Sequence, residues 1–403
     1  MKNNVYLNEL LKLKNNFSIK LITGVRGTGK LKLLGEFVDY LKSNGVDESN
    51  IIFMDFENTE HLTDFQELYS YVNKKIENLD YVYLLFHGIQ KIRDWEKAIN
   101  ALFLGTPSEI YIADSNEKLL TEKLIQMLPN NCDVLKLYPL SFTEYLKSLS
   151  LDLNDLDSPE SDMDTLLKNY LCFGGMPIMS KYPMDENVLE RLLAGLLYES
   201  LLKDVVIKYS IRNPYLLQCI MKFLALNSGK SIKLKCLDDY FVSVGQSVTS
   251  FTLDNYLNII NESEIFKKIP RYDLKKSVFV NANECFYCAD SGLCNALLDF
   301  NSYNETALIK NVVYLELMRQ GYDVYSPIIG TMTADFFAVS NEKKLCLQVL
   351  PAGEEDSLTK ILRPLHKLPD NVDKVVISRN PVRTKKNVKN ITVIDFLLNN
   401  DWH

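Results

Sequence analysis

The chain has 403 residues, of which 47% are apolar and 24% are charged, and its net charge is −7 at neutral pH. This length predicts two or three domains, and the composition is typical of a soluble globular protein. The acidic balance argues against a globally basic surface of the kind that grips nucleic-acid backbones. No run approaches the roughly 18 apolar residues of a membrane span, and the N-terminus has no signal-peptide pattern, so we predict a cytoplasmic protein.

The first part of the chain alternates strand and helix patterns. Predicted strands lie at 17–23, 51–57, 80–87, 109–116 and 133–140, and predicted helices at 31–45, 65–78, 94–103 and 117–128. This alternation predicts a parallel, doubly wound sheet, in which ligands bind at the carboxyl ends of the strands. We therefore predict an α/β domain over residues 1–150.

The remainder of the chain is predicted to contain a linker and two further parts. Residues 151–164 hold six acids and no base, which predicts a solvated linker. Over 165–290 we predict helices, ending in a helix–helix–hairpin pattern that is typical of a winged helix. Over 305–403 the pattern is again a helix followed by strands, which predicts a second, smaller α/β domain.

The first predicted strand runs into GVRGTGKL, residues 24 to 31. A G-x-x-x-x-G-K segment between an apolar strand and an amphipathic helix indicates a phosphate-binding loop, although a glycine-rich turn with a surface lysine is the alternative. Successive backbone N–H groups would cradle the phosphates, and Lys30 would lie against the β- and γ-phosphates. We predict that ATP or ADP is bound by Gly24, Val25, Arg26, Gly27, Thr28, Gly29, Lys30 and Leu31.

By several segments, the chain resembles a family of predicted prokaryotic ATPases that have an N-terminal AAA-type domain and a C-terminal domain of unknown function. The segments cover nearly the whole chain: IKLITGVRGTGK, NIIFMDFEN, WEKAINAL, PLSFTEYL, YLCFGGMP, KDVVIKYSIRN, IPRYDLK, ADSGLCNALL and NVVYLELMRQGYDVY. The resemblance implies a restriction-endonuclease-like fold for 305–403, with a winged helix between that domain and the ATPase core.

The chain departs from this family where the chemistry of hydrolysis takes place. The Ser or Thr whose hydroxyl would hold Mg²⁺ is replaced by Leu31. The family's Asp-Glu pair, which would hold Mg²⁺ and polarise the attacking water, is replaced by His87 and Gly88. The family's candidate arginine finger corresponds to Asn131. Four changes in different catalytic roles indicate a site that has lost its chemistry.

Our hypothesis is a degenerate ATPase that binds a nucleotide weakly, hydrolyses it inefficiently and acts through a protein partner. A regular magnesium site is not expected, although the polar pair Ser115 and Asn116 remains at the sensor strand. One alternative is an active ATPase in which Asp55 and Glu57, at the end of the neighbouring strand, approach the magnesium position. A nucleic-acid-binding module is the other alternative.

The predicted C-terminal domain carries only part of a nuclease site. Nucleases of the restriction-endonuclease fold place an acid at the end of one strand and E-x-K on the next, and these carboxylates hold metal ions. Here Asp335 is followed by Gln348 and Leu350, and Lys310 stands where relatives often carry Glu. Because one carboxylate cannot assemble this site, we predict no phosphodiester cleavage.

Nucleic-acid binding depends on another segment. The second helix of the winged pattern, within 247–263, has no Lys or Arg and carries acids such as Asp254 and Glu262, so it is unsuited to DNA. Residues 377–390 are basic and hold no acid. Such a run is either a solvated loop or a nucleic-acid patch, and the candidate contacts are Arg379, Arg383, Lys385, Lys386 and Lys389.

Eight scattered cysteines indicate reduced thiols. Cys285, Cys288 and Cys294 lie close in sequence, but neither a His nor a further Cys lies nearby as a fourth zinc ligand. The pattern therefore favours structural thiols.

Overall fold

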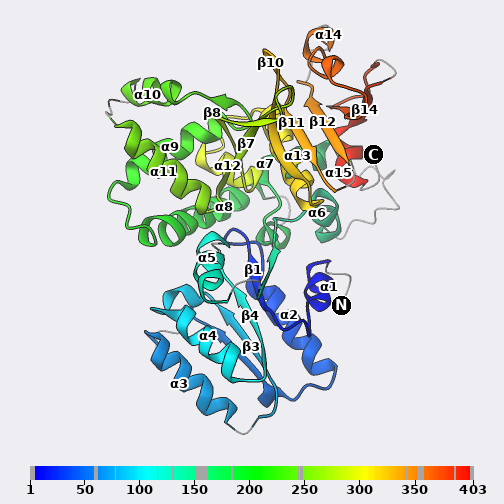
Figure 1. Ribbon diagram of the computed structural model, residues 1–403. Helices are drawn as coiled ribbons and strands as arrows, with labels where there is room; N and C mark the ends of the chain where they lie inside the picture. Colours follow the sequence, from blue (N-terminus) through cyan, green and yellow to red (C-terminus); the bar gives the residue numbers. More distant parts are fainter. Residues whose placement is uncertain are drawn as a thin grey trace. The chain divides into compact units, whose positions relative to one another are not determined.

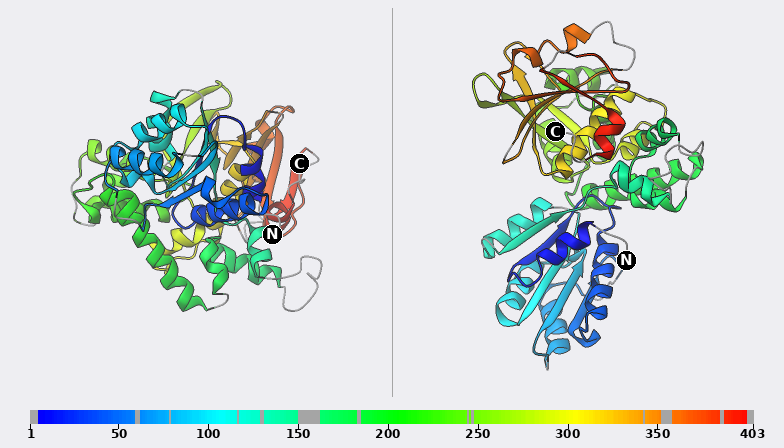
Figure 2. Two further views of the ribbon diagram at one scale, coloured as in Figure 1. Left: turned by 90° about the horizontal axis from the view of Figure 1, so that it is seen from below. Right: turned by 90° about the vertical axis from the view of Figure 1, so that its right-hand side faces the viewer.

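The computed structural model describes residues 5–58, 62–77, 79–115, 117–128, 131–149, 162–182, 185–243, 245, 248–341, 343–351, 358–384 and 387–399. These residues form two compact units, Met1–Leu137 and Tyr138–His403, which are drawn in Figures 1 and 2. Of the predicted linker, 151–161 lies outside the described residues. Within these ranges, every helix is too short or too polar to span a membrane.

The first unit alternates helices and strands, as predicted. Its elements are α1 Val5–Lys12, β1 Ile19–Thr23, α2 Lys30–Ser43, η1 Glu48–Asn50, β2 Ile51–Asp55, α3 Phe65–Ile76, β3 Val82–His87, η2 Ile89–Lys91, α4 Trp95–Gly105, β4 Ser108–Ala113, α5 Glu117–Met127 and β5 Cys132–Lys136. The strands form a five-stranded sheet in the order β2-β3-β4-β1-β5. All neighbours are parallel, which confirms the predicted α/β class.

Helices cover both faces of this sheet (Figure 1). On one face, α1 and α2 pack through Leu10, Leu34 and Phe37. On the other, α3, α4 and α5 pack through residues such as Val72 and Trp95. Strands buried on both faces consist of nearly continuous apolar runs, which is the pattern seen in the sequence.

The sheet register brings the ends of three strands to one edge. Asp55 at the end of β2 pairs with His87 at the end of β3, and His87 pairs with Ala113 at the end of β4. The loop after β1 leaves the sheet next to β4, because these two strands are neighbours. Residues that follow β1, β2, β3 and β4 therefore meet at this edge although they lie far apart in the sequence.

The second unit combines helices with a mixed sheet. Its elements are α6 Phe142–Ser148, α7 Met163–Phe173, η3 Pro177–Lys181, α8 Glu186–Ser200, the π-helix η4 Leu201–Ile207, α9 Pro214–Leu226, β6 Ser231–Ile232, α10 Leu234–Ser243, α11 Ser250–Glu262, β7 Phe266–Asp273, β8 Val278–Cys288, α12 Ser291–Leu297, α13 Glu305–Arg319, β9 Asp323–Ile329, β10 Met332–Thr333, β11 Phe336–Val339, β12 Lys344–Val349, α14 Leu358–Ile361, η6 Leu365–Lys367, β13 Asp373–Ser378, β14 Lys389–Thr392 and α15 Val393–Leu398. The strand order is β14-β13-β12-β11-β9-β7-β8-β6, and β10 pairs with β9.

One strand pair joins the two parts that we predicted as separate. β7 belongs to the predicted region 165–290 and β9 to the predicted domain 305–403, and they pair in parallel from Arg271 opposite Ser326 onward. The two predicted parts therefore share one sheet and one compact unit. The first unit also ends at Leu137 rather than at residue 150, because α6 packs into the core of the second unit.

The helix–helix–hairpin pattern is present as α10, α11, β7 and β8. Its identity as a winged helix stays a prediction, as does the restriction-endonuclease-like identity of 305–403.

Candidate functional site

Glycines shape the loop between β1 and α2. Gly24, Gly27 and Gly29 have φ values of 133°, 91° and 95°, which side chains with a Cβ rarely adopt. A Cβ on Gly24 would also lie 2.2 Å from the carbonyl oxygen of Leu137. The Thr28 hydroxyl donates to the carbonyl of Val25 at 2.9 Å and closes the loop. The loop conformation therefore depends on these residue types.

Lys30 is the first residue of α2, and its side chain folds back into the loop. Its Nζ donates to the carbonyl oxygens of Gly24 at 2.6 Å and Val25 at 3.0 Å, and the side chain is buried. No side chain caps the helix at Gly29, and the first turn contains no acid. The positive end of the helix dipole and a buried ammonium therefore meet at the loop.

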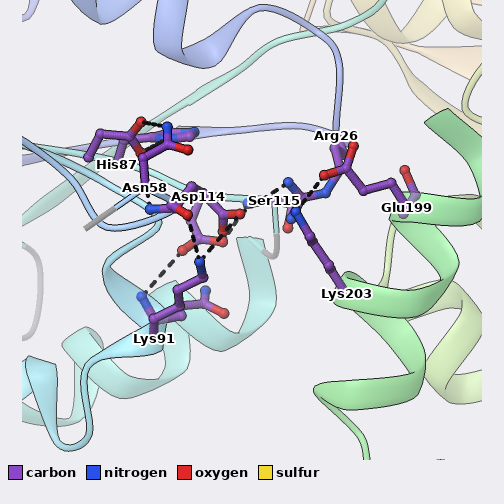
Figure 3. Close-up of polar contacts among 12 residues, drawn as sticks. Arg26, Asn58, His87, Lys91, Asp114, Ser115, Glu199 and Lys203 are labelled. Atoms are coloured by element: carbon purple, nitrogen blue, oxygen red, sulfur yellow. Dashed lines mark hydrogen bonds and ion pairs between the residues drawn. The ribbon is translucent and has the colours of Figure 1, made fainter. Parts of the chain in front are cut away.

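The loop opens on a cavity of about 340 Å³ at the carboxyl edge of the sheet. This volume is within the range of small-molecule sites. The cavity is lined by Arg26, Gly27, Gly29, Lys30, Leu31, Lys32, Glu57, His87, Gly88, Asp114 and Ser115. Residues from the loop, from the end of β3 and from the segments after β2 and β4 therefore meet in one pocket. Figure 3 labels four of its lining residues, Arg26, His87, Asp114 and Ser115.

The His87 side chain forms a hydrogen bond with Asp55 at the carboxyl end of β3. Its Nδ1 lies 2.7 Å from Oδ1 of Asp55, and the other carboxylate oxygen accepts from Asn58 at 2.6 Å. Partial burial raises the pKa of Asp55, but the hydrogen bonds from His87 and Asn58 and the charge of His87 outweigh it, so the net pKa lies below its usual value. Asp55 is therefore an ionised acceptor, and Nδ1 of His87 carries the proton.

Glu57 lies beside Gly88, where the family carries its glutamate. Gly88 has φ +68°, and a Cβ there would lie 3.0 Å from Cγ of Glu57. The Glu57 carboxylate is 3.5 Å from Arg26 and 3.7 Å from Lys91. The Glu57 carboxylate, two residues after β2, thus approaches the position where a side chain at residue 88 would lie. Arg26 and Lys91 already pair with this carboxylate.

Asp114 and Lys32 are pocket residues that the sequence analysis did not name, and Asp114 is the buried one of the two. It follows β4 directly and is buried. Its carboxylate accepts the N–H of Ser115 at 2.7 Å and the N–H of Gln90 at 3.4 Å. The signal was available in the sequence, because an acid directly after a buried strand lies at the ligand-binding edge of a parallel sheet. Ser115 lines the pocket as predicted, and Asn116 lies outside the described residues.

Asn131 is not brought to the pocket. Its carbonyl accepts the N–H of Ile19 at 2.8 Å, at the amino ends of β1 and β5. The pocket is at the opposite ends of these five-residue strands, roughly 16 Å away at the usual strand rise. An arginine at position 131 would therefore not line this pocket of its own chain.

The residues around Asp335 come together but form an internal ion pair. Lys310 Nζ lies 2.6 Å from Oδ1 of Asp335. The other oxygen accepts the Gln348 side-chain amide and the N–H of Val349, both at 2.7 Å. Leu350, two residues after Gln348, is buried. An ammonium therefore accompanies the carboxylate that a nuclease of this kind would use to bind a metal ion. Among the described residues, no cluster of three potential metal ligands is found.

One residue of the predicted basic run, Arg379, forms ion pairs within the second unit. Arg379 lies 2.9 Å from Asp164 and 3.7 Å from Glu305. Arg383 and Lys389 are exposed, and Lys385 and Lys386 lie outside the described residues.

The three clustered cysteines are buried in β8 and α12. Burial raises the pKa of the Cys285 thiol to about 12.

The donor set around the loop does not fit a regular magnesium site. Magnesium needs hard oxygen ligands and usually one or two carboxylates besides the phosphates. Here Asp55 accepts from His87, Glu57 accompanies Arg26 and Lys91, and Asp114 accepts backbone N–H groups. Leu31 supplies no hydroxyl.

Comparison with known proteins agrees with this geometry. Residues 16–146 match the family described as an AAA domain, and residues 164–304 match a domain of unknown function, DUF8612. An uncharacterized protein of Haemophilus influenzae is 28% identical over 98% of this chain and 97% of its own length. An uncharacterized protein of Methanocaldococcus jannaschii is 24% identical over 90% of this chain and 82% of its own length.

Among solved structures, the Walker-type ATPase of Pyrococcus abyssi has a similar fold. It is 14% identical, covers 73% of this chain and 95% of its own length, and has a TM-score of 0.51. At this identity the likeness concerns the fold alone. The N-terminal part of the chain is thus an AAA-type, ATPase-like P-loop domain.

Proposed function

We propose, from the premise that the chain begins with an AAA-type P-loop domain, that residues 24–31 bind a nucleoside triphosphate or diphosphate that the protein hydrolyses slowly. The nucleotide is expected to be ATP or ADP. Bound nucleotide, rather than its turnover, is then the state that a protein partner would recognise.

One observation carries this proposal: the buried Lys30 ammonium lies within the loop at the uncapped N-terminus of α2, beside a cavity of about 340 Å³. A triphosphate offers the anionic oxygens that this arrangement lacks. When a phosphate enters, the Lys30 side chain would exchange the carbonyls of Gly24 and Val25 for phosphate oxygens.

Slow hydrolysis is supported by the chemistry at the end of β3. His87 pairs with Asp55, Gly88 has no side chain, and Leu31 has no hydroxyl. The pocket therefore lacks the usual groups that hold Mg²⁺ and polarise water.

The test is calorimetric titration with ATP, followed by a phosphate-release assay. Replacing Lys30 with Met is expected to weaken ATP binding at least about tenfold, the weight of one charge-assisted hydrogen bond. Lys42→Met, near the far end of the same helix and paired with Glu48, serves as the matched control and should bind ATP as the wild type does. Equal affinities for wild type and Lys30→Met would reject the proposal.

An active ATPase that uses Glu57 is the second candidate, because this carboxylate reaches the place left by Gly88. It predicts phosphate release above about 1 s⁻¹, the low end of ordinary enzyme rates. It also predicts that Glu57→Gln abolishes this release while binding is kept. Phosphate release below that rate in the wild type favours the proposed slow hydrolysis over this second candidate.

A nucleic-acid-binding function finds less support. Arg379 already pairs with two acids in its own unit, so it would have to give up these partners to contact a phosphate backbone. If the remaining cations did bind DNA or RNA, affinity would fall steeply with added salt.

A further inference from the structure

We propose that Arg26 makes the pocket selective for a nucleoside triphosphate over a diphosphate, and that Glu57 limits this selectivity by competing for the Arg26 guanidinium. This inference rests on the proposed nucleotide binding and adds which phosphate a side chain recognises. It follows from the contact between these two residues, which both line the cavity, and from the second cation that Glu57 holds.

The residues that line the cavity come from two regions of the chain. One region is the loop with the first turn of α2, and the other consists of residues at or just after the ends of β2, β3 and β4. A loop of this kind holds the inner phosphates of a nucleotide through its backbone N–H groups, and its lysine reaches toward the outer ones. The part of the cavity at the strand ends therefore remains for the terminal phosphate.

Arg26 connects these two regions. It belongs to the loop, and its Nη1 lies 3.5 Å from Oε2 of Glu57, two residues after the end of β2. Both side chains are 19% exposed, so the ion pair is largely shielded from solvent. A guanidinium is always charged and binds phosphate oxygens with a planar fork of N–H donors. Its attraction to a terminal phosphate therefore depends on no change of protonation.

Glu57 can release Arg26 because it has a second cation. The Nζ of Lys91 lies 3.7 Å from the Glu57 carboxylate and donates to the backbone carbonyl of Glu57 at 3.0 Å. A shielded carboxylate that lost every cation would be strongly destabilised. With Lys91 in place, the guanidinium would turn from the carboxylate to the phosphate while Glu57 stays paired.

Lys30 is expected to act on both nucleotides. Its ammonium lies within the loop, against the carbonyl oxygens of Gly24 and Val25, and so would contact a diphosphate as well as a triphosphate. Loss of Lys30 should weaken the binding of both, whereas loss of Arg26 should weaken the triphosphate alone. The two variants thereby separate binding by the loop from recognition of the terminal phosphate.

The experiment is calorimetric titration of the full-length protein with a non-hydrolysable ATP analogue and with ADP, in the same buffer with MgCl₂. It compares the wild type with Arg26→Ala, Glu57→Gln, Lys30→Met and the matched control Arg93→Ala. The Arg93 guanidinium also lies 3.5 Å from a carboxylate of the same unit, that of Asp64, and Arg93 is not one of the residues that line the cavity. The readout is the ratio of the Kd for ADP to the Kd for the analogue.

Arg26→Ala is expected to bind the analogue about tenfold more weakly than the wild type, as for one lost charge-assisted hydrogen bond, and to change the Kd for ADP less than about threefold. Glu57→Gln is expected to bind the analogue about threefold more tightly, since the competing ion pair is weakened. Arg93→Ala should keep the wild-type ratio. A gain of affinity in Glu57→Gln cannot result from misfolding, so it tests the competition even where Arg26→Ala folds poorly.

The outcomes separate this inference from the proposed function. If Arg26→Ala keeps its circular dichroism spectrum and the wild-type ratio, the role of Arg26 is overturned, although binding by the loop stands if Lys30→Met still loses both nucleotides. If Glu57→Gln binds the analogue no more tightly than the wild type, the competition is overturned. If the wild type binds neither nucleotide, the proposed function itself fails.

Discussion

At the scale of single residues, Gly24 is the most sensitive position of the loop. It combines a φ of +133° with a carbonyl oxygen only 2.2 Å from the place of a Cβ. Gly24→Ala is therefore expected to lower the free energy of unfolding by about 1–3 kcal/mol, the usual cost of such strain, and to weaken ATP binding. Urea unfolding monitored by circular dichroism, together with calorimetric titration, measures both effects.

Gly35→Ala is the matched control for this prediction. Gly35 lies within α2, and nothing lies within 4 Å of the place of its Cβ. Alanine favours a helix over glycine by about 1 kcal/mol, so this variant should be slightly more stable and bind ATP normally. If Gly24→Ala proved as stable as Gly35→Ala and bound ATP as well, the loop would not be constrained as described.

The residue scale also separates what the sequence could predict from what it could not. The substitutions at Leu31, His87 and Gly88 were visible, because each occupies a position defined by a local motif. The pairing of His87 with Asp55 and the approach of Glu57 to Gly88 were not, since these residues are about 30 positions apart and meet only through the β2–β3 register. Asp114 could have been predicted from its place directly after a strand.

At the scale of elements, the first turn of α12, which contains Gly292, packs closely against Gly174 at the end of α7. Asp290, the N-cap residue of α12, accepts the N–H groups of Leu293 at 3.1 Å and Gly175 at 2.8 Å. A Cβ on Gly174 would lie 2.1 Å from this carboxylate, and one on Gly292 would lie 2.1 Å from the carbonyl oxygen of Phe173. The segments YLCFGGMP and ADSGLCNALL therefore fit together only with glycine at these positions.

The buried Asp290 carboxyl at this contact predicts a pH dependence of stability. Burial raises the pKa of Asp290 to about 6, against the lowering effect of its N–H donors, so between about pH 4 and pH 6 the folded state binds the proton more strongly than the unfolded state. The stabilising contribution is fully present below pH 4 and is lost as the pH rises through 6. The shift of about two units corresponds to roughly 3 kcal/mol.

Asp290→Asn isolates this contribution, since asparagine also caps helices well but does not titrate. The difference in free energy of unfolding between wild type and variant should change by about 2 kcal/mol between pH 4.5 and pH 7.5, in the direction that favours the wild type at the lower pH. Chemical unfolding across this range measures it. A constant difference would show that the buried carboxyl does not titrate in this window.

The boundaries of helices and strands were predictable where the residues that define them are neighbours in the sequence. The strand–loop–helix unit around Lys30 was predicted, because an apolar run, glycines and an amphipathic period follow one another directly. The strand predicted over 133–140 ends at Lys136, three residues before Pro139. Proline has no N–H for the sheet ladder, which is consistent with this early end.

At the scale of the whole molecule, two compact units have separate hydrophobic cores. The core of the first lies on both faces of the parallel sheet, and that of the second lies on both faces of the mixed sheet. The sequence indicated three parts because its patterns change character twice after residue 150. It could not show that β7 pairs with β9, since strand pairing across about 50 residues leaves no local pattern.

Hydrogen exchange of the backbone amides tests the central claim most directly, because the claim concerns N–H groups that cradle a phosphate. In the full-length wild type, saturating ATP is expected to slow exchange over residues 24–31 and the first turn of α2. The second unit serves as an internal reference, and Lys30→Met should lose the effect. Unchanged exchange over 24–31 at millimolar ATP, in both EDTA and MgCl₂, would contradict nucleotide binding by this loop.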